Sequence, residues 1–281
     1  MTFVEKLTQA IEWNNSLLCV GLDPRPDRFP SPVMAQPDPT FAFNKAIVDA
    51  TLDLACAYKP NFAFYEVQGL EGLAALRRTM EYIHEVTDVP VILDAKRGDI
   101  GSTAEAYAKA AFEVWGADAV TVNPYLGYDS IAPFLETPGK GVFVLCRTSN
   151  PGASDFQDTR CIPQGNGSAA PPLFELVALK AAQWNTGGNV GLVVGATYPQ
   201  QLKRVRELCP NLTLLIPGIG AQGGDLAKTV EYGVDANGER AIINSSRQVL
   251  YASKGSDFAR AARRQALDLR DRINQHLASR L

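Results

Sequence analysis

Eight short apolar segments recur along the chain, and most of them are separated by stretches with the apolar spacing of amphipathic helices. The apolar segments are residues 17–22, 57–63, 89–94, 119–122, 141–146, 190–194, 212–216 and 241–244. Strands that alternate with helices pair in parallel, and eight parallel strands can close into a barrel. The pattern therefore predicts an α/β fold of the (β/α)8 TIM-barrel type.

The stretches between these segments predict the helices of the barrel. Apolar residues recur at helical spacing in residues 41–54, 71–86, 102–114, 173–183, 199–208 and 226–232, and again in the arginine-rich final stretch 257–281. Residues 2–13 form another amphipathic segment before the first strand, and Thr2 and Glu5 have the spacing of a capping box. We expect this segment to be an N-terminal lead-in helix.

Length and charge limit the classes of protein to which the chain can belong. With 281 residues, 46% of them hydrophobic, it can bury one large core, and we expect a single catalytic domain over residues 1–281. The chain has 27 Lys and Arg residues and 30 Asp and Glu residues, so it lacks the excess of basic residues that nucleic-acid binding requires. No apolar run approaches the length of a membrane span, and the first residues carry Glu5 and lack a cationic segment followed by an apolar block. We expect a cytoplasmic protein without a nucleic-acid or membrane partner.

Cysteine and histidine usage argues against a metal site. The cysteines are odd in number, widely spaced and free of CxxC pairs: Cys19, Cys56, Cys146, Cys161 and Cys209. This pattern is typical of reduced thiols in a cytosolic protein. The two histidines, His84 and His276, are too few for a histidine-rich metal site. We therefore expect no bound metal.

The clearest candidate for a reactive centre is a charged run at the end of the third apolar segment. Asp94 and Lys96 are two residues apart, so their side chains point to the same side of a strand, and Asp99 follows beyond the turn. Charged groups at the open end of a buried strand are costly unless they bind something. A purely structural interpretation is also open, in which the charges form an ion pair and Asp99 or Ser102 caps the next helix.

Two segments interrupt the alternation, and both follow predicted strands. Residues 23–38 contain five prolines, and residues 150–172 are rich in Pro, Gly, Ser and Asn. In a parallel barrel the loops after the strands form the mouth at which ligands bind. Both segments are therefore predicted to face a substrate.

One longer motif and five shorter ones, all at predicted strand ends, connect the chain to a known family. The longer motif is Asp-x-Lys-x-x-Asp-Ile-x-x-Thr, formed by Asp94, Lys96, Asp99, Ile100 and Thr103. The shorter ones are Gly21-Leu22-Asp23, Tyr58-Lys59-Pro60, Ser149-Asn150-Pro151-Gly152, the glycine-rich residues 217–224 and Asn244-Ser245-Ser246-Arg247. Together they span nearly the whole chain and resemble the orotidine 5′-phosphate decarboxylases, in the subfamily with the longer loop.

The resemblance implies a cofactor-free carboxy-lyase that converts orotidine 5′-phosphate to UMP and CO2 in pyrimidine biosynthesis. Lys96 would be the acid that protonates the ring carbon, and Asp94 would face the departing carboxylate. Asp99, Ile100 and Thr103 would complete the site of a neighbouring subunit, which implies a homodimer with shared active sites. Carboxylates on either side of Lys96 should keep its ammonium protonated and ready to donate a proton.

The resemblance also implies a phosphate site at the ends of the seventh and eighth strands. Pro217, Gln222, Ser246 and Arg247 would form it, because backbone amides in a glycine-rich turn and a guanidinium both suit a phosphate. The glycines alone are also compatible with a simple tight turn. Since the family's usual glycine before this arginine is Ser246 here, a hydroxyl must fit near the phosphate.

Three further residues would bind the rest of the nucleotide. Asp23 and Lys59 would hold the ribose hydroxyls, and Ser149 would contact the pyrimidine edge. Asp23 is also a common type of turn residue before Pro24. An ammonium on an interior strand needs a carboxylate beside it, and Asp94 is the candidate for Lys59.

Two alternatives belong to other functional classes. A sister group of barrels uses a similar Asp-x-Lys-x-x-Asp run with Mg²⁺ in sugar-phosphate decarboxylase or aldolase chemistry, but it has a metal-binding glutamate where Lys59 stands here. A non-catalytic nucleotide-binding barrel is the other alternative. Loss of Lys96 or Arg247 would favour it, and both residues are present.

Overall fold

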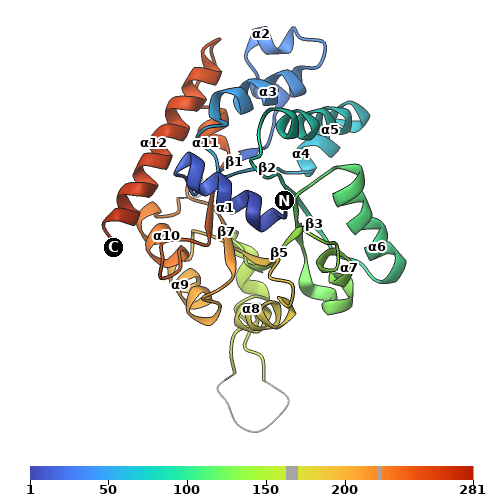
Figure 1. The fold of residues 1–281 in the computed structure, drawn as a ribbon, viewed down its shortest axis with the longest axis vertical. Coiled ribbons are helices and arrows are strands. Elements are labelled where there is room, and N and C mark those ends of the chain that lie inside the picture. The colour runs from blue at the N-terminus through green and yellow to red at the C-terminus, as the bar shows by residue number, and fades with distance from the viewer. Residues whose placement is uncertain (163–169, 221–222, 281) are drawn as a thin grey trace.

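Eight parallel strands form the centre of the structure, a computed structural model that describes residues 1–162, 170–220 and 223–280. The strands are β1 (Leu18–Leu22), β2 (Ala57–Pro60), β3 (Ile92–Arg97), β4 (Ala119–Val122), β5 (Gly141–Arg147), β6 (Val190–Val194), β7 (Thr213–Pro217) and β8 (Ala241–Ser245). They pair in the order β2-β1-β8-β7-β6-β5-β4-β3. Parallel bridges between Tyr58 and Val91 and between Asn61 and Asp94 bring β2 and β3 together. The predicted (β/α)8 barrel is confirmed (Figure 1).

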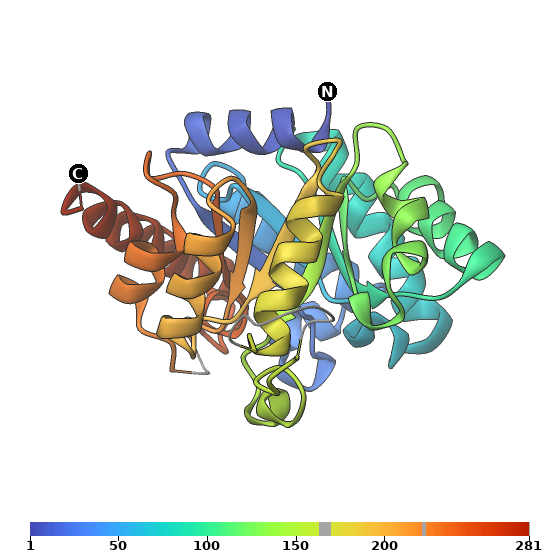
Figure 2. The same cartoon turned by 90° about the horizontal axis from the view of Figure 1, so that it is seen from below.

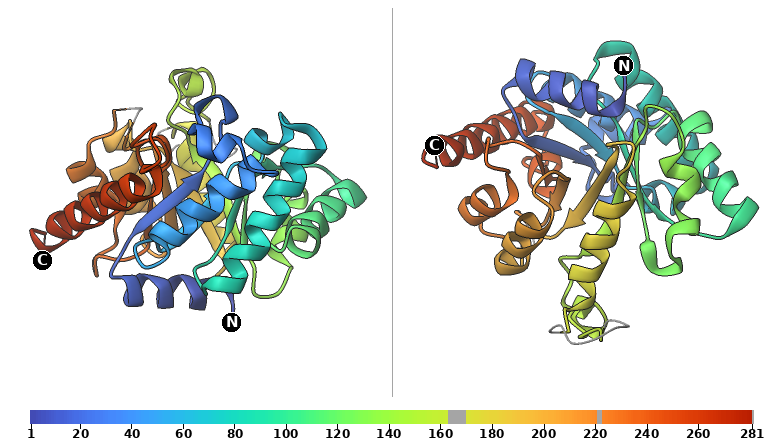
Figure 3. Two further views of the ribbon diagram at one scale, coloured as in Figure 1. Left: turned by 90° about the horizontal axis from the view of Figure 1, so that it is seen from above. Right: turned by 60° about the horizontal axis from the view of Figure 1, so that its bottom comes forward.

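Helices surround the strands (Figure 1). They are α1 (Phe3–Asn14), α2 (Ser31–Met34), α3 (Pro39–Thr51), α4 (Ala63–Glu66), α5 (Gly69–Val86), α6 (Gly101–Lys109), α7 (Ala132–Leu135), α8 (Leu173–Trp184), α9 (Pro199–Leu208), α10 (Leu226–Gly233), α11 (Arg247–Leu250) and α12 (Phe258–Ala278). The long closing helix α12 packs against α3 and α10, so the last helix completes the outer layer (Figure 3). The six helices predicted between strands are all present.

The core has two apolar layers, one inside the barrel and one between strands and helices. Every strand contributes a side chain to the inner layer: Cys19, Ala57, Ile92, Ala119, Phe143, Val193, Leu215 and Ile242. The larger outer layer joins the other faces of the strands to the helices. Because the strands are buried on both faces, they read as continuous apolar runs in the sequence. The filled interior leaves room for a ligand only at an end of the barrel.

Helix α1 closes one of those ends. The predicted capping box is present, because Thr2 Oγ1 accepts a hydrogen bond from Glu5 N while Glu5 Oε2 accepts one from Thr2 N. Phe3 packs edge-on against Phe143 of the inner layer and leaves no room for a side chain at Gly141. Figure 2 shows α1 across one end of the barrel, while the segment after β5 projects from the opposite end.

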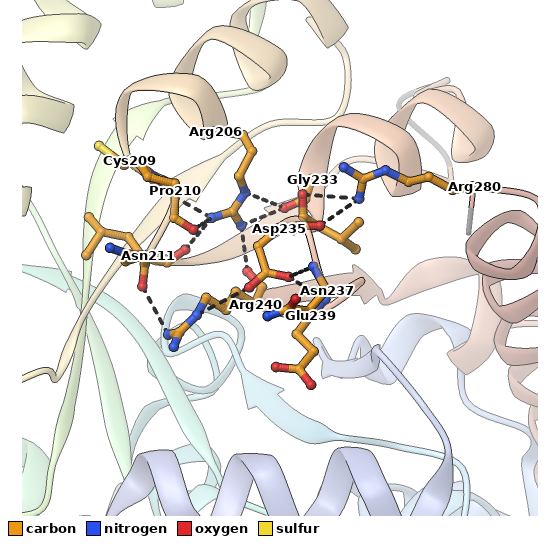
Figure 4. A network of polar contacts seen from close by, with 12 residues as sticks. Arg206, Cys209, Pro210, Asn211, Gly233, Asp235, Asn237, Glu239, Arg240 and Arg280 are labelled. Atoms are coloured by element: carbon orange, nitrogen blue, oxygen red, sulfur yellow. Dashed lines mark hydrogen bonds and ion pairs between the residues drawn. The ribbon is translucent and has the colours of Figure 1, made fainter.

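A buried arginine joins two helix-to-strand turns near the end of the barrel that α1 covers (Figure 4). The guanidinium of Arg206, in α9, donates to five carbonyl oxygens, which belong to Cys209, Pro210, Leu212, Gly233 and Arg240. Burial lowers the pKa of this guanidinium to about 10, against the opposing effect of the nearby Asp235 carboxylate. The ends of α9 and α10 are thereby held to the starts of β7 and β8.

The structure differs from the sequence-based prediction at several boundaries. The predicted strand 89–94 begins and ends three residues later, as β3, and so includes Lys96 in an irregular continuation. The predicted loop 23–38 contains a 3-10 turn (Pro26–Arg28) and the short helix α2. The predicted helix 102–114 is α6 followed by a π-helical turn, Ala110–Val114.

Four of the five cysteines are buried, and all five are free thiols. Cys161 is only partly buried, unlike the others. None of the helices in the described residues has the length and apolar content that a membrane crossing requires.

Candidate active site

The largest group of predicted site residues lies around one cavity of about 530 Å³ at the carboxyl ends of the strands. The predicted residues in its wall are Asp23, Lys59, Asp94, Lys96, Ser149, Pro217, Ser246 and Arg247. They come from strands β2, β3 and β7 and from the segments that follow β1, β5 and β8. Strand ends that are far apart in the sequence thus meet at one mouth, as the barrel fold requires.

Asp94 lies between two lysines on the floor of this cavity. Its Oδ2 accepts a hydrogen bond from Lys59 Nζ at 2.9 Å, and its Oδ1 accepts one from Lys96 Nζ at 2.5 Å. Lys59 is 4% exposed, whereas the side chain of Lys96 is 47% exposed and open to a ligand. The predicted pairing of Lys59 with Asp94 is therefore confirmed. Of the two lysines, Lys96 is the one that a substrate can reach.

The charges at the cavity floor shift the pKa values of Asp94 and Lys59 toward the ionised forms. Burial alone would raise the pKa of the Asp94 carboxyl, but Lys59 and Lys96 outweigh it and hold this pKa well below its usual range. Burial likewise would lower the pKa of Lys59, and the carboxylates of Asp94 and Asp23 raise it instead. The cavity floor thus carries fixed charges before any ligand binds.

The two-residue spacing of Asp94 and Lys96 predicted a regular strand, but the backbone at Lys96 is irregular. Its φ is 50°, in the left-handed region, and the pairing of β3 with β4 shifts between Leu93 and Arg97. The Lys96 side chain nevertheless contacts Asp94, and the backbone amide of Lys96 donates to Thr121 Oγ1 at 3.0 Å. Thr121 also donates to Asp94 Oδ1 at 3.0 Å.

Asp23 and Ser246 meet where β1 and β8 end. Ser246 Oγ donates to Asp23 Oδ2 at 2.6 Å, so the hydroxyl that replaces the family's glycine has a carboxylate as its partner. Asp23 Oδ1 is buried and makes no hydrogen bond within the described residues. A buried carboxylate oxygen that receives no hydrogen bond from the protein can accept one from a ligand hydroxyl. Asp23 therefore lies in the cavity wall as well as before Pro24.

The predicted phosphate end of the cavity is formed by β7 and β8. Pro217, Gly218 and Gly220 line it together with the exposed Arg247. Gly218 has a φ of 109°, and a side chain at Gly224 would clash with the Gly218 carbonyl at 2.7 Å, so this turn requires glycine. Gln222, the other predicted phosphate ligand, lies outside the described residues.

The segment after β5 forms another wall. Ser149 lines the cavity beside Thr148 and Gln157, and Gln157 Oε1 accepts a hydrogen bond from Thr148 N at 2.8 Å. The buried guanidinium of Arg147 makes two bonds to the Asp158 carboxylate, at 3.1 and 3.0 Å. The beginning of the long loop is thus fastened to the barrel. The prediction that the loop 150–172 faces the cavity is confirmed for Asn150 and Gln157.

Asp99, Ile100 and Thr103 lie away from the cavity of their own chain. Asp99 Oδ1 accepts a hydrogen bond from Ile100 N, and Ile100 is 60% exposed. Neither Asp99 nor Ser102 caps α6, because Ile100 occupies the capping position and makes no side-chain cap. Lys96 consequently has one carboxylate partner, Asp94, among the described residues of a single chain, where two were predicted.

Sequence reasoning missed several polar groups in the cavity wall. They are Asn61, Thr121, Thr148 and Gln157, while Asn244 and Ser245 stood in a motif without an assigned role. Thr121 gave one usable signal, since it is a polar residue in the otherwise apolar strand Ala119–Val122. Gln157 gave none, because its position depends on how the long loop folds back.

The charges in the described part of the cavity wall favour an anionic ligand. Lys59, Lys96 and Arg247 are cationic, and Asp23 and Asp94 are anionic. Within residues 1–162, 170–220 and 223–280, no cluster of three or more His, Cys, Asp or Glu side chains has the arrangement of a metal site. The Asp94 carboxylate is occupied by two lysines and a hydroxyl.

Comparison with known proteins agrees with the geometry. Residues 16–263 match the model of the orotidine 5′-phosphate decarboxylase / HUMPS family. Proteins named orotidine 5′-phosphate decarboxylase from Ralstonia nicotianae and Aromatoleum aromaticum are 55% and 56% identical over 278 residues, which cover 98% of this chain and 99% and 100% of theirs. The solved Leishmania donovani OMP decarboxylase is 41% identical, has a TM-score of 0.83 and is matched over 99% of both chains. The resemblance drawn from the sequence motifs is confirmed, and the chain belongs to the orotidine 5′-phosphate decarboxylase family.

Proposed function

We propose that this chain decarboxylates orotidine 5′-phosphate to UMP and CO2, the carboxy-lyase step of de novo pyrimidine biosynthesis. The observation that supports this most directly is the Lys59–Asp94–Lys96 array at the floor of the cavity. Decarboxylation without a cofactor leaves an electron pair on a ring carbon, so the rate must come from charges that are in place beforehand. Family membership points to the same reaction.

The nucleotide is proposed to lie across the mouth from β7 and β8 to β3. Arg247 and the amides of the turn after Pro217 bind the phosphate, with Ser246 beside them and Gln222 as a further donor. Asp23 Oδ1, which has no partner among the described residues, accepts a hydrogen bond from a ribose hydroxyl. An excess of one positive charge in the described wall offsets part of the substrate's negative charge.

The base end of the nucleotide is proposed to lie between Lys59, Ser149 and Lys96. Lys59 donates to a ribose hydroxyl while it remains paired with Asp94. Ser149 bonds to the edge of the pyrimidine. This pose places the substrate carboxylate beside Asp94 and the ring carbon that carries it within reach of the Lys96 ammonium.

Lys96 is the proposed proton donor. The bond between the ring carbon and the carboxylate breaks, its electron pair stays on the ring carbon, and CO2 leaves. A proton from Lys96 Nζ then forms the new C–H bond of UMP, and the lysine regains its proton from water. Asp94 holds the Lys96 ammonium in position through the bond between Lys96 Nζ and Asp94 Oδ1, as a general acid requires.

A homodimer with shared sites is proposed to complete the array. Asp99, Ile100 and Thr103 lie outside the cavity of their own chain and would serve the partner's cavity. Exposed large apolar side chains follow the ends of β2, β3 and β4: Val67, Leu70, Ile100, Tyr107, Tyr125, Leu126 and Tyr128. Such side chains are typical of a surface that a second subunit covers. We also propose that the enzyme works in the cytoplasm.

The decisive experiment is a decarboxylation assay in the presence of EDTA. Purified protein is mixed with orotidine 5′-phosphate, and the fall in ultraviolet absorbance and the release of CO2 are followed. We expect the same activity with and without chelator, because two lysines and the Thr121 hydroxyl already bond the Asp94 carboxylate. Activity that requires Mg²⁺ would support the sugar-phosphate alternative, and no turnover in either condition would refute the proposed reaction.

A further inference from the structure

We propose that Thr121 is a positioning residue that sets the geometry of Lys96 and Asp94 for proton transfer. The inference rests on the proposed function and adds to it a residue from β4 that none of the sequence motifs contains. Thr121 is 1% exposed, yet its side chain lies in the wall of the cavity next to the two charged groups. It is expected to act on the substrate only through Lys96 and Asp94.

The need for such a residue arises from the backbone of β3. In the pairing of β3 with β4, Leu93 is opposite Val120 and Arg97 is opposite Val122. Three residues of β3 therefore face the single residue Thr121. The extra length bulges, and Lys96 takes a left-handed φ of 50°, which costs energy for a residue with a side chain.

The bulge removes the amide of Lys96 from the regular pairing between strands. A buried or half-buried amide without an acceptor is unfavourable, and here Thr121 Oγ1 is the acceptor at 3.0 Å. The same hydroxyl uses its proton to bond Asp94 Oδ1 at 3.0 Å. That oxygen also accepts from Lys96 Nζ.

The contacts form a closed loop from the Lys96 amide through Thr121 and Asp94 to the Lys96 ammonium. One hydroxyl thus fixes both ends of the lysine, namely its main chain directly and its ammonium by way of the carboxylate. Asp94 Oδ2 is held separately by Lys59, so the carboxylate cannot rotate freely. Threonine suits the role because its branched side chain has few rotamers and its hydroxyl both accepts and donates.

The test compares Thr121→Val, Thr121→Ser and Thr229→Val with the wild-type protein. Valine keeps the shape of threonine and removes the hydroxyl, whereas serine restores the hydroxyl. Thr229, in α10, is a matched control, since it is also 1% exposed and its hydroxyl donates to the carbonyl of Asp225, the residue before that helix, outside the cavity. The readouts are kcat, KM, the affinity for UMP and the melting temperature.

We expect T121V to lower kcat by about 10–100-fold, because small misplacement of a reacting group has effects of this size. KM and the affinity for UMP should stay within about threefold of wild type, since Thr121 is 1% exposed and the proposed nucleotide contacts are made by other residues. T121S should recover kcat to within about threefold. T229V should lower the melting temperature without changing kcat.

Three results would overturn the role of Thr121. They are an unchanged kcat in T121V, a loss of kcat that T121S shares in full, and a loss that T229V reproduces. If T121V does not fold, Thr121→Cys, a weak donor of similar size, must give a kcat below that of T121S. An inactive wild-type protein would refute the proposed function itself, whereas an active wild type with an equally active T121V would refute only the role of Thr121.

Discussion

Ser246 donates its hydroxyl proton to Asp23 Oδ2 at 2.6 Å and so joins the segments that follow β8 and β1. The contact links a residue beside the proposed phosphate site to the carboxylate proposed to hold the ribose. Asp23 keeps its other oxygen, Oδ1, directed away from any protein donor among the described residues. The orientation of that oxygen therefore depends on Ser246.

Replacing Ser246 with alanine should weaken nucleotide binding more than it slows the chemical step. Loss of the orienting hydrogen bond is expected to raise KM by about 3–10-fold, with kcat within about twofold, because a bond of this kind to a charged group contributes at most a few kcal/mol. Steady-state kinetics measure both. Ser253→Ala is the matched control, since Ser253 Oγ donates to Asp257 Oδ1 over the same 2.6 Å and neither residue lines the cavity. A variant with wild-type KM would show that Asp23 needs no such support.

Lys96→Ala should abolish most of the turnover and leave a nucleotide site. Removal of a general acid costs about 100–10,000-fold in rate, and we expect a loss toward the upper end because Lys96 is the exposed ammonium at the site. UMP binding, measured by calorimetry, should weaken far less than kcat falls. Lys45→Ala removes an ammonium from an exposed ion pair with Asp49 and serves as the control. Unchanged turnover in K96A would exclude Lys96 as the acid.

Arg247→Ala should weaken the binding of ligands that carry a phosphate. The expected loss is about 1.5–3 kcal/mol, the usual contribution of a charged hydrogen bond. Dissociation constants for UMP and for uridine, which lacks the phosphate, separate this effect from general damage to the site. Uridine binding that falls as much as UMP binding would contradict the assignment.

Mixed dimers test whether Asp99 serves the partner's site. Asp94→Ala and Asp99→Ala subunits are each expected to be nearly inactive alone, but a mixed dimer would contain one site with both residues intact. Random mixing makes half of the dimers mixed, so activity should return to about a quarter of wild type. Mixing D94A with K96A is the control, because both changes affect the same chain's own cavity and no intact site can form. If activity returns in neither the D94A–D99A mixture nor the control mixture, the site is not shared between subunits.

The ionised carboxylate of Asp118 should stabilise the folded protein near neutral pH and lose this effect in acid. This carboxylate, next to β4, binds Lys6 of α1, His84 of α5 and the amide of Val91. Burial would raise its pKa, but these partners outweigh burial and hold the pKa well below its usual range. The unfolded chain therefore binds this proton at a higher pH than the folded chain does, so the stabilisation is complete above about pH 5 and is lost as the pH falls below about 4.

Urea unfolding of Asp118→Asn at several pH values measures this contribution. At pH 5.5 the variant should be less stable by about 3 kcal/mol, because the partners of a largely buried carboxylate lose their charge pairing. The difference from wild type should shrink by up to about 1.4 kcal/mol per pH unit below pH 4. Asp257→Asn, at an exposed ion pair with Arg264, is the comparison. A constant difference from pH 5.5 to pH 3 would show that the Asp118 charge has no part in folding.

The barrel and most of its cavity could be predicted because they depend on local patterns. Apolar runs that are buried on both faces identify strands, and parallel strands bring polar residues at their ends to one mouth. Asp23, Lys59 and Arg247 could therefore be placed together although they are far apart in the chain. The capping box at Thr2 was equally visible, since it depends on residues three apart.

The sequence did not predict features in which one strand or loop determines the conformation of another. The bulge that gives Lys96 its left-handed backbone depends on how β3 pairs with β4, and spacing along β3 alone predicted a regular strand. Ser246 looked like a group beside the phosphate, and its bond to Asp23 became visible only once β8 and β1 were adjacent. The contributions of Thr121 and Gln157 arise in the same way, from contacts between separate segments.

The five carbonyls gathered by Arg206 limit where the chain could be given new ends. A break between α9 and β7 or between α10 and β8 would release main-chain oxygens that one guanidinium now holds together, and both turns would open at once. Circular permutants should instead begin in the exposed turn at residues 186–188, between α8 and β6. Chains rearranged there would keep the base of the barrel shut, and their catalytic mouth lies at the opposite end.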